Sequence, residues 1–139
     1  MSTTTTTEKK YRTITLTDRP PVRFADRDWP VIANSHYHEW DGEFQPQANR
    51  EWRGYVRVRQ HADGRSIVYA WAWHTTALRG GRGYQQHAGE LLEPGADLVS
   101  AIHRVHNTIN VVYEEGCSIH ERWRLLAAEC IADLPAEDL

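Results

Sequence analysis

The strongest constraint on the fold of this chain is a pair of alternating apolar and polar runs separated by a short turn signal. The runs WRGYVRVRQ and RSIVYAWAWHT are joined by HADGR, and the sequence ADG suits the tip of a β-hairpin. Side chains on a strand point alternately to its two faces. One face of the first run therefore carries Arg53, Tyr55, Arg57 and Arg59.

The turn decides which side chains of the second run share that face, and the sequence allows two registers. A two-residue turn places Val56 and Val58 beside the large side chains of the second run, which are Ile67, Tyr69, Trp71 and Trp73. A three-residue turn with Gly64 as a bulge places the arginines beside the aromatics instead. In that case the core receives Val56, Val58, Val68, Ala70 and Ala72.

Three further extended segments are predicted before this hairpin. Residues 11–18 alternate cleanly, with Ile14 and Leu16 on one side, and the pair Pro20 and Pro21 is expected to end that strand. Residues 22–28 and 31–40 are the other two segments. In the second of these, alternation places His36, His38 and Trp40 on one face. Residues 76–94 hold four glycines and no sustained period, which indicates a long loop.

Two helices are predicted after that loop. Asp97 is a capping residue before an apolar stripe formed by Leu98, Ile102, Val105, Ile109 and Val112, and Gly116 is expected to end this helix. Ser118 and Glu121 form a capping box at the start of the next helix. Its stripe consists of Ile119, Trp123, Leu126, Cys130 and Leu134, and Pro135 closes it.

Strands therefore come first and helices last, an order that favours an α+β fold over a parallel βαβ sheet. We expect an antiparallel sheet of four or five strands covered on one face by two C-terminal helices. A length of 139 residues fits one domain. The threonine-rich residues 1–9 have nothing to bury and are expected to be a disordered tail, with residues 10–139 forming the single domain.

Composition bears on location and on partners. No apolar run approaches the roughly 20 residues needed to cross a bilayer, and the start MSTTTTTEKK lacks the apolar middle of a secretory signal. With only two cysteines, we expect a cytoplasmic protein with reduced thiols and no membrane partner. The net charge is −3, but residues 50–82 hold seven arginines against two carboxylates, whereas residues 83–139 hold three arginines against ten carboxylates. The basic segment either meets an anionic partner or pairs with the acidic helices of the same chain.

Histidines offer one alternative chemistry. His36 and His38 point the same way on a strand, as a transition-metal site requires. Together with Glu43 they resemble the first motif of the cupin family, which implies a metal-binding β-barrel enzyme. The glycine that this motif places before the histidines falls at Pro30, and no second cupin motif follows, because His103 lies in a predicted helix. We therefore expect the two histidines at a sheet rim, with no bound metal or other cofactor.

Two weaker signals remain. Cys117 precedes a predicted helix and has His120 nearby, but no orienting third group accompanies them, so a small apolar role is expected for the cysteines. The stretch RGGRG, with Arg79 and Arg82, has glycine amides and guanidinium groups that suit phosphate. It lacks the Gly-Lys-Ser/Thr sequence of a phosphate-binding P-loop.

The sequence thus favours a small non-enzymatic binding protein, acting as an accessory or inhibitory factor. Its predicted surface combines the hairpin face with the glycine-rich loop and consists of Arg53, Tyr55, Arg57, Arg59, Trp71, Trp73, Arg79 and Arg82. We expect a protein partner, since Trp and Arg dominate protein interfaces, and a second copy of the chain is one such partner. A nucleic acid bound by the same face and the histidine-dependent metal enzyme are the two alternatives.

Overall fold

The computed structural model describes residues 10–41, 50–75, 83–110 and 118–138. Its main feature is an antiparallel four-stranded sheet in the order β3-β4-β5-β6. These strands are β3 (Val31–Asp41), β4 (Arg50–Gln60), β5 (Ser66–Thr75) and β6 (Gly83–Leu92). A separate two-stranded hairpin is formed by β1 (Tyr11–Leu16) and β2 (Arg19–Ala25). The predicted α+β class with an antiparallel sheet is confirmed.

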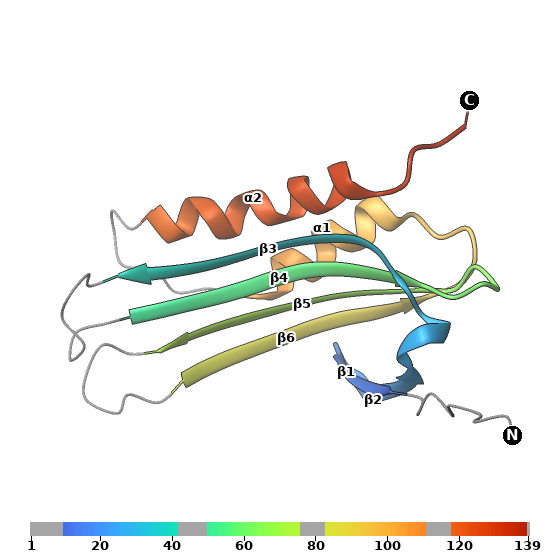
Figure 1. The fold of residues 1–139 in the computed structure, drawn as a ribbon, viewed down its shortest axis with the longest axis horizontal. Coiled ribbons are helices and arrows are strands. Elements are labelled where there is room, and N and C mark those ends of the chain that lie inside the picture. The colour runs from blue at the N-terminus through green and yellow to red at the C-terminus, as the bar shows by residue number, and fades with distance from the viewer. Residues whose placement is uncertain (1–9, 42–49, 76–82, 111–117, 139) are drawn as a thin grey trace, which may run out of the picture.

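Different elements pack on the two faces of the sheet. Helix α1 (Leu98–Thr108) packs on β5 and β6, and helix α2 (Ser118–Asp133) packs on β3 and β4. Figure 1 shows both helices on one side of the sheet and the β1–β2 hairpin on the other. The prediction that the C-terminal helices cover one face is therefore confirmed, and neither helix is long and apolar enough to cross a membrane.

The register between β4 and β5 follows the three-residue turn. Arg57 pairs with Tyr69 and Tyr55 with Trp71. Gly64 has a φ of +95°, and its N–H donates to the His61 carbonyl across the turn. A positive φ of this kind favours glycine, and the bulged turn adds the residue that brings arginines and aromatics to one face.

The core between sheet and helices consists of the small and branched side chains that this register predicts. Val56, Val58, Val68, Ala70 and Ala72 are all buried there. From α1 and α2 they meet Ile102, Val105, Trp123, Leu126 and Cys130. Alanines on the strands let the helices approach closely, and the larger side chains of the helices fill the space between.

Strand β6 was wrongly expected to be part of a loop. It runs from Gly83 to Leu92 and pairs along its length with β5. Its sequence, GYQQHAGELL, has two glycines and no β-branched residue, so local propensity predicts no strand. The segment is a strand because its backbone forms a regular hydrogen-bonded ladder with β5, which its own composition does not predict.

The ends of two other elements also differ from prediction. Pro20 and Pro21 lie within β2 rather than ending β1, beside a register shift between Ile14 and Leu16. Proline is tolerated there because a bulge or sheet edge does not require its missing N–H. Asp18, with a φ of 57°, lies in the turn between the two strands.

Helix α1 begins as predicted but ends earlier. Asp97 accepts a hydrogen bond from the Ser100 N–H at 3.1 Å, which confirms the cap. The helix ends at Thr108 because the chain that follows is held by β6. The Gln86 side chain donates to the Asn110 carbonyl at 2.5 Å and accepts from its N–H at 3.0 Å. The predicted end at Gly116, the Ser118 side chain on which the capping box depends and the tail at residues 1–9 lie outside the described residues.

Candidate functional site: the open face of the sheet

The sheet face opposite the helices has two ends with different surroundings. Toward the β4–β5 turn, the β1–β2 hairpin packs over β5 and β6 and buries Leu16, Phe24, Ile67 and Tyr69. Gly89 permits this close approach, since a Cβ there would lie 2.9 Å from the Thr15 carbonyl. Toward the other end of the strands, the side chains are half-buried or exposed. We call that second part the open face.

Two cross-strand rows make up the open face. The first row is His36, Tyr55, Trp71 and His87, and the second is His38, Arg53, Trp73 and Gln85. Each row takes one residue from each of the four strands. Because paired residues on neighbouring strands have Cβ atoms only about 5 Å apart, the eight side chains form one continuous patch.

Aromatic rings form the centre of the patch. The Trp71 and Trp73 rings are nearly parallel, with centroids 6.5 Å apart and an interplanar angle of 10°. Tyr55 lies 5.5 Å from Trp71, and the Trp71 indole N–H donates to Gln85 at 3.1 Å. Burial raises the pKa of the Tyr55 phenol, so it is un-ionised at neutral pH. Both tryptophans are half-buried, which leaves part of each ring for contact.

Two arginines flank these rings. The Arg53 guanidinium lies 5.6 Å from the Trp73 centroid and donates to Glu51 at 2.6 Å. The Arg57 guanidinium lies 4.2 Å from the Tyr55 centroid and donates to Asn34 at 2.9 Å. Cation–π contacts of this kind hold the guanidinium planes against the rings. The arginines and aromatics therefore form one packed surface rather than separate groups.

Arg59 has a different role from its predicted one. It is only 4% exposed and donates to the Tyr69 hydroxyl at 2.8 Å and to the Trp29 carbonyl at 2.9 Å. It also bonds Asp26, whose pKa is lowered by Arg12 and then by Arg59. Arg59 thus holds the segment after the hairpin onto the sheet and offers no exposed surface to a partner.

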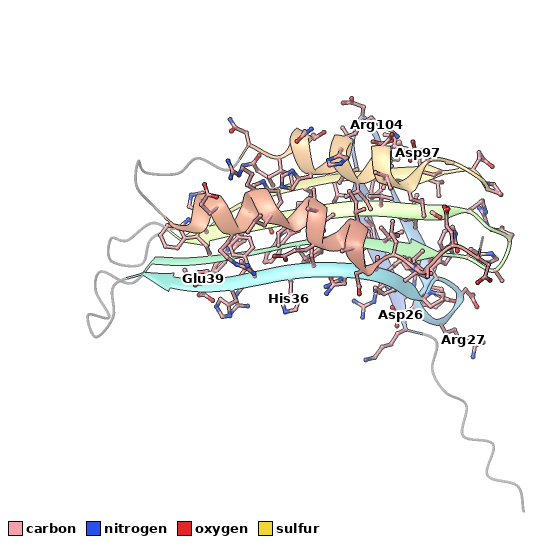
Figure 2. All side chains as sticks on the ribbon, turned by 90° about the horizontal axis from the view of Figure 1, so that it is seen from above. Asp26, Arg27, His36, Glu39, Asp97 and Arg104 are labelled. Carbon is pink, nitrogen blue, oxygen red and sulfur yellow. The ribbon has the colours of Figure 1, made fainter. Side chains whose placement is uncertain are left out.

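Within the part of the chain that the structure describes, the arginine row does not pair with the C-terminal helices, which was the alternative left open by the sequence. The helices lie on the opposite face, where their charges make other pairs. Arg104 of α1 contacts Glu90 at 2.9 Å, and Arg122 of α2 lies 3.9 Å from Glu39. Figure 2 looks onto this helical layer and shows Arg104, Asp97 and Glu39 there.

The described side chains of the open face carry little net charge. Arg53 is balanced by Glu51, which is itself only 13% exposed and also contacts His38 at 2.6 Å. Arg57 is the other described cation of the patch at neutral pH, apart from any protonated histidine. A surface with so little excess positive charge recognises shape and apolar area more than it attracts a polyanion.

The histidine pair lies on the open face. His36 and His38 are both exposed, as the alternation predicts. The His36 ring lies 3.3 Å from the Asn34 amide nitrogen, and His38 contacts Glu51. Among the described residues, no three His, Cys, Asp or Glu side chains are arranged to hold a metal ion. Glu43, the third residue of the cupin-like motif, lies outside the described residues.

The remaining candidates fall into two groups. Arg79, Arg82, Cys117 and the side chain of His120 lie outside the described residues. Cys130 is buried, and burial raises the pKa of its thiol to about 12, which makes it a small apolar core residue as predicted. His106 is also buried, stacked 4.8 Å from Trp123 and bonded to that residue's carbonyl, whereas His103 is exposed.

Sequence reasoning missed part of the open face. Gln85 and His87 belong to β6, which was assigned to a loop, and Glu51 lies next to Arg53 but was not linked to it. The sequence does contain a signal for the Glu51–Arg53 pair, because residues two apart on a strand lie on the same face. No comparable local signal marks Gln85 or His87.

Comparison of this chain with protein-family models, with curated proteins and with solved structures finds no match.

Proposed function

We propose that this chain is a non-enzymatic binding protein of the cytoplasm that engages a protein partner through the open face, as an accessory or inhibitory factor. The observation that carries the proposal is the partly exposed, stacked pair Trp71 and Trp73 at the centre of a flat patch of four strands. Trp, Tyr and Arg are the residues that contribute most to protein interfaces, and here all three are in mutual contact.

The geometry also favours a preorganised surface. Trp71 is held by Tyr55 and Gln85, and Trp73 is held by Arg53. A ring that is already fixed before binding loses little conformational freedom when a partner arrives. The open face therefore has the large rigid rings that anchor an interface, without the entropy cost of ordering long mobile side chains.

Charge favours protein over nucleic acid as the partner class. A nucleic-acid surface gains most of its affinity from cations that neutralise phosphates, and the open face has Arg53 compensated by Glu51. The partner segment that fits best presents apolar or aromatic side chains to Trp71 and Trp73. It also carries a carboxylate for Arg57, whose guanidinium is bonded in part to the neutral Asn34 amide.

The test uses matched pairs of variants. Trp73→Ala and Arg53→Gln alter the open face, whereas Leu125→Ala and Arg124→Gln alter exposed positions on α2. Arg124 matches Arg53 because each pairs with a glutamate, Glu121 at 2.9 Å in one case and Glu51 at 2.6 Å in the other. Proteins captured from the host by the wild-type chain are identified, and the one lost with the first pair but kept with the second is purified.

Calorimetry on that purified partner gives the quantitative result. Trp73→Ala is expected to weaken binding by a factor of roughly 30 or more, as a central aromatic anchor does, and Arg53→Gln by about tenfold. The α2 variants are expected to bind like wild type. Unfolding curves of all four variants exclude loss of the folded state as the cause.

Two results contradict the proposal. One is a set of captured proteins that the open-face variants leave unchanged. The other is salt-sensitive binding of single-stranded DNA or RNA that Arg57→Ala abolishes, which assigns the face to nucleic acid. Elemental analysis of untagged protein tests the alternative of a metal enzyme. Stoichiometric zinc, iron or manganese would support that alternative.

A further inference from the structure

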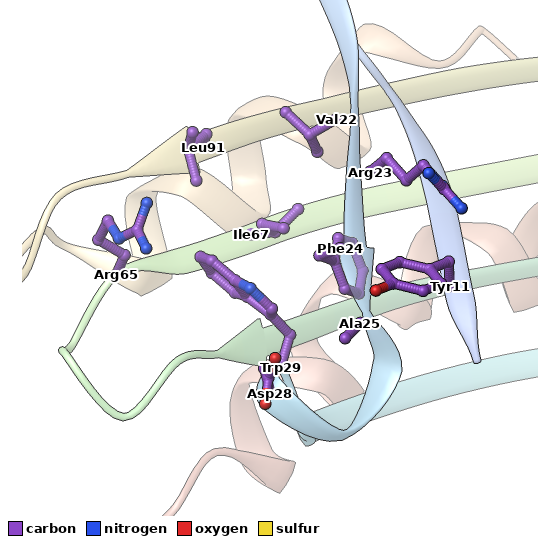
Figure 3. Close-up of a pocket in the computed structure, with 10 residues that line it drawn as sticks. All are labelled: Tyr11, Val22, Arg23, Phe24, Ala25, Asp28, Trp29, Arg65, Ile67 and Leu91. Carbon is purple, nitrogen blue, oxygen red and sulfur yellow. The ribbon is translucent and has the colours of Figure 1, made fainter. Parts of the chain in front are cut away.

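A cavity of about 410 Å³ lies at the covered end of the sheet, away from Trp73. It is bounded by the β1–β2 hairpin, by Trp29 and by the ends of β5 and β6 (Figure 3). Its volume falls within the range of small-molecule sites, roughly 300–1,000 Å³. The open face does not account for it, and neither partner class considered above requires it.

The inner wall of this cavity is built from apolar side chains that are almost fully buried. Phe24, Trp29 and Ile67 line it and are 7%, 8% and 1% exposed. Trp29 is held from one side by Phe24 at 5.8 Å and from another by His61 at 5.0 Å. Leu91 of β6 completes this wall, as Figure 3 shows. Val22 and Leu91 are the half-buried apolar residues of the lining, and their branched side chains present the apolar surface that a ligand can contact.

Two arginines lie at opposite sides of the cavity in Figure 3, Arg23 on β2 and Arg65 before β5. The Arg23 guanidinium lies 4.3 Å from the Tyr11 centroid, and it makes no ion pair with any residue that the structure describes. The Arg65 guanidinium lies 5.1 Å from the Trp29 centroid, and its Nε donates to Asp63 at 2.7 Å. Asp28 is the one carboxylate among the described residues that line the cavity.

We propose that this cavity binds a small apolar carboxylate, with the hydrocarbon part against Val22 and Leu91 and the carboxylate at Arg23. The guanidinium fork matches a carboxylate, and Arg23 has no competing carboxylate partner among the described residues. Arg65, partly neutralised by Asp63, adds a second cationic wall. Arg23 is the lining cation that no described carboxylate neutralises, so we expect an anion to bind at Arg23.

The test compares three probes of one shape. These are 2-naphthoate, the neutral 2-naphthamide and the cation 2-naphthylmethylammonium, each titrated into the full chain and followed by two-dimensional NMR. We expect saturable shifts at the Trp29 indole and at Leu91. We also expect 2-naphthoate to bind about tenfold more tightly than the amide, as one charge-assisted pair allows.

Variants of β2 give the matched comparison. Arg23→Gln is expected to reduce the affinity for 2-naphthoate to that for the amide. Arg19→Gln, an exposed arginine of the same strand that does not line the cavity, is expected to change nothing. Val22→Phe fills the cavity and is expected to abolish binding of both probes, and its unfolding curve verifies that the chain still folds.

Four outcomes overturn the proposal. Equal affinity for the acid and the amide would show that the arginines do not bind the carboxylate. Tighter binding of the ammonium probe would show that Asp28 determines the charge preference of the site. Shifts confined to residues that do not line the cavity place the probe elsewhere. Tighter binding of a peptide ending in a free C-terminal phenylalanine assigns the cavity to a peptide terminus rather than to a small molecule. None of these results depends on the variants that test the open face.

Discussion

At the scale of single residues, the arginines of β4 show how one strand face acquires two roles. Arg53, Arg57 and Arg59 all lie on the same side of the strand, as their spacing of two and four residues requires. Arg59 lies under the segment that follows the hairpin and is buried, whereas the side chain of Arg53 is 48% exposed. The period of the sequence therefore predicts the face, and only the packing above it separates structural from exposed residues.

We expect Arg59→Ala to destabilise the chain strongly. The change leaves the Tyr69 hydroxyl, the Trp29 carbonyl and Asp26 without this donor. Removal of one member of a buried charged network costs about 3 kcal/mol in free energy of unfolding. Urea denaturation measures this loss, with Arg124→Ala, an exposed pair on α2, as the control that stays near wild type. Equal stability of the two variants would show that the network contributes nothing.

At the scale of elements, the β1–β2 hairpin depends on contacts that lie far apart in sequence. Asp26 follows the hairpin and accepts hydrogen bonds from Arg12 of β1 and Arg59 of β4. Gly89 of β6 admits the hairpin, and Thr17 donates its backbone N–H to the Gly89 carbonyl at 2.9 Å. The sequence predicts strands here, but the order of strands in space comes from these distant partners.

The Asp26 contacts predict a pH dependence of stability. The pKa of Asp26 in the folded chain lies below its ordinary value of 3.8. The stabilisation is therefore fully present above that ordinary value and is lost as the pH falls through the lower, folded-state pKa. We expect Asp26→Asn to be less stable than wild type at neutral pH, and the difference to shrink in strong acid. Urea midpoints of both chains across an acid series measure it, and a difference independent of pH would contradict the assignment.

At the scale of the whole molecule, the helices, the four-stranded sheet and the β1–β2 hairpin form three layers with different roles. The helices and the inner sheet face form the main core, the sheet carries the open face, and the hairpin encloses the cavity at the other end (Figure 1). The two proposed sites thus use different ends of one sheet face. The two helices lie on the opposite face, away from both sites.

The thiol of Cys130 reports on the integrity of these layers. It lies fully buried between α2 and the sheet, and burial raises its pKa to about 12. Because the reactive form is the thiolate, we expect a Cys117→Ser chain to react with a disulfide reagent only as fast as it unfolds. The rate of thiol modification, measured with and without urea, tests this. Reaction in native buffer at the rate of a free peptide thiol would show that the helical layer opens readily.

The sequence by itself determined the local features of this protein. Alternation grouped the side chains of β3 and β4 by face, apolar spacing located the helices, and strands before helices indicated the α+β class. These features depend on the periods of a strand and a helix, which are properties of neighbouring residues.

Tertiary structure alone decided the strand identity of β6, the early end of α1 and the burial of Arg59. In each case a distant partner supplied the contacts: β5 for β6, Gln86 for the chain after α1, and Asp26 with Tyr69 for Arg59. Contacts between residues far apart along the chain leave no local period. They form only when the layers pack together.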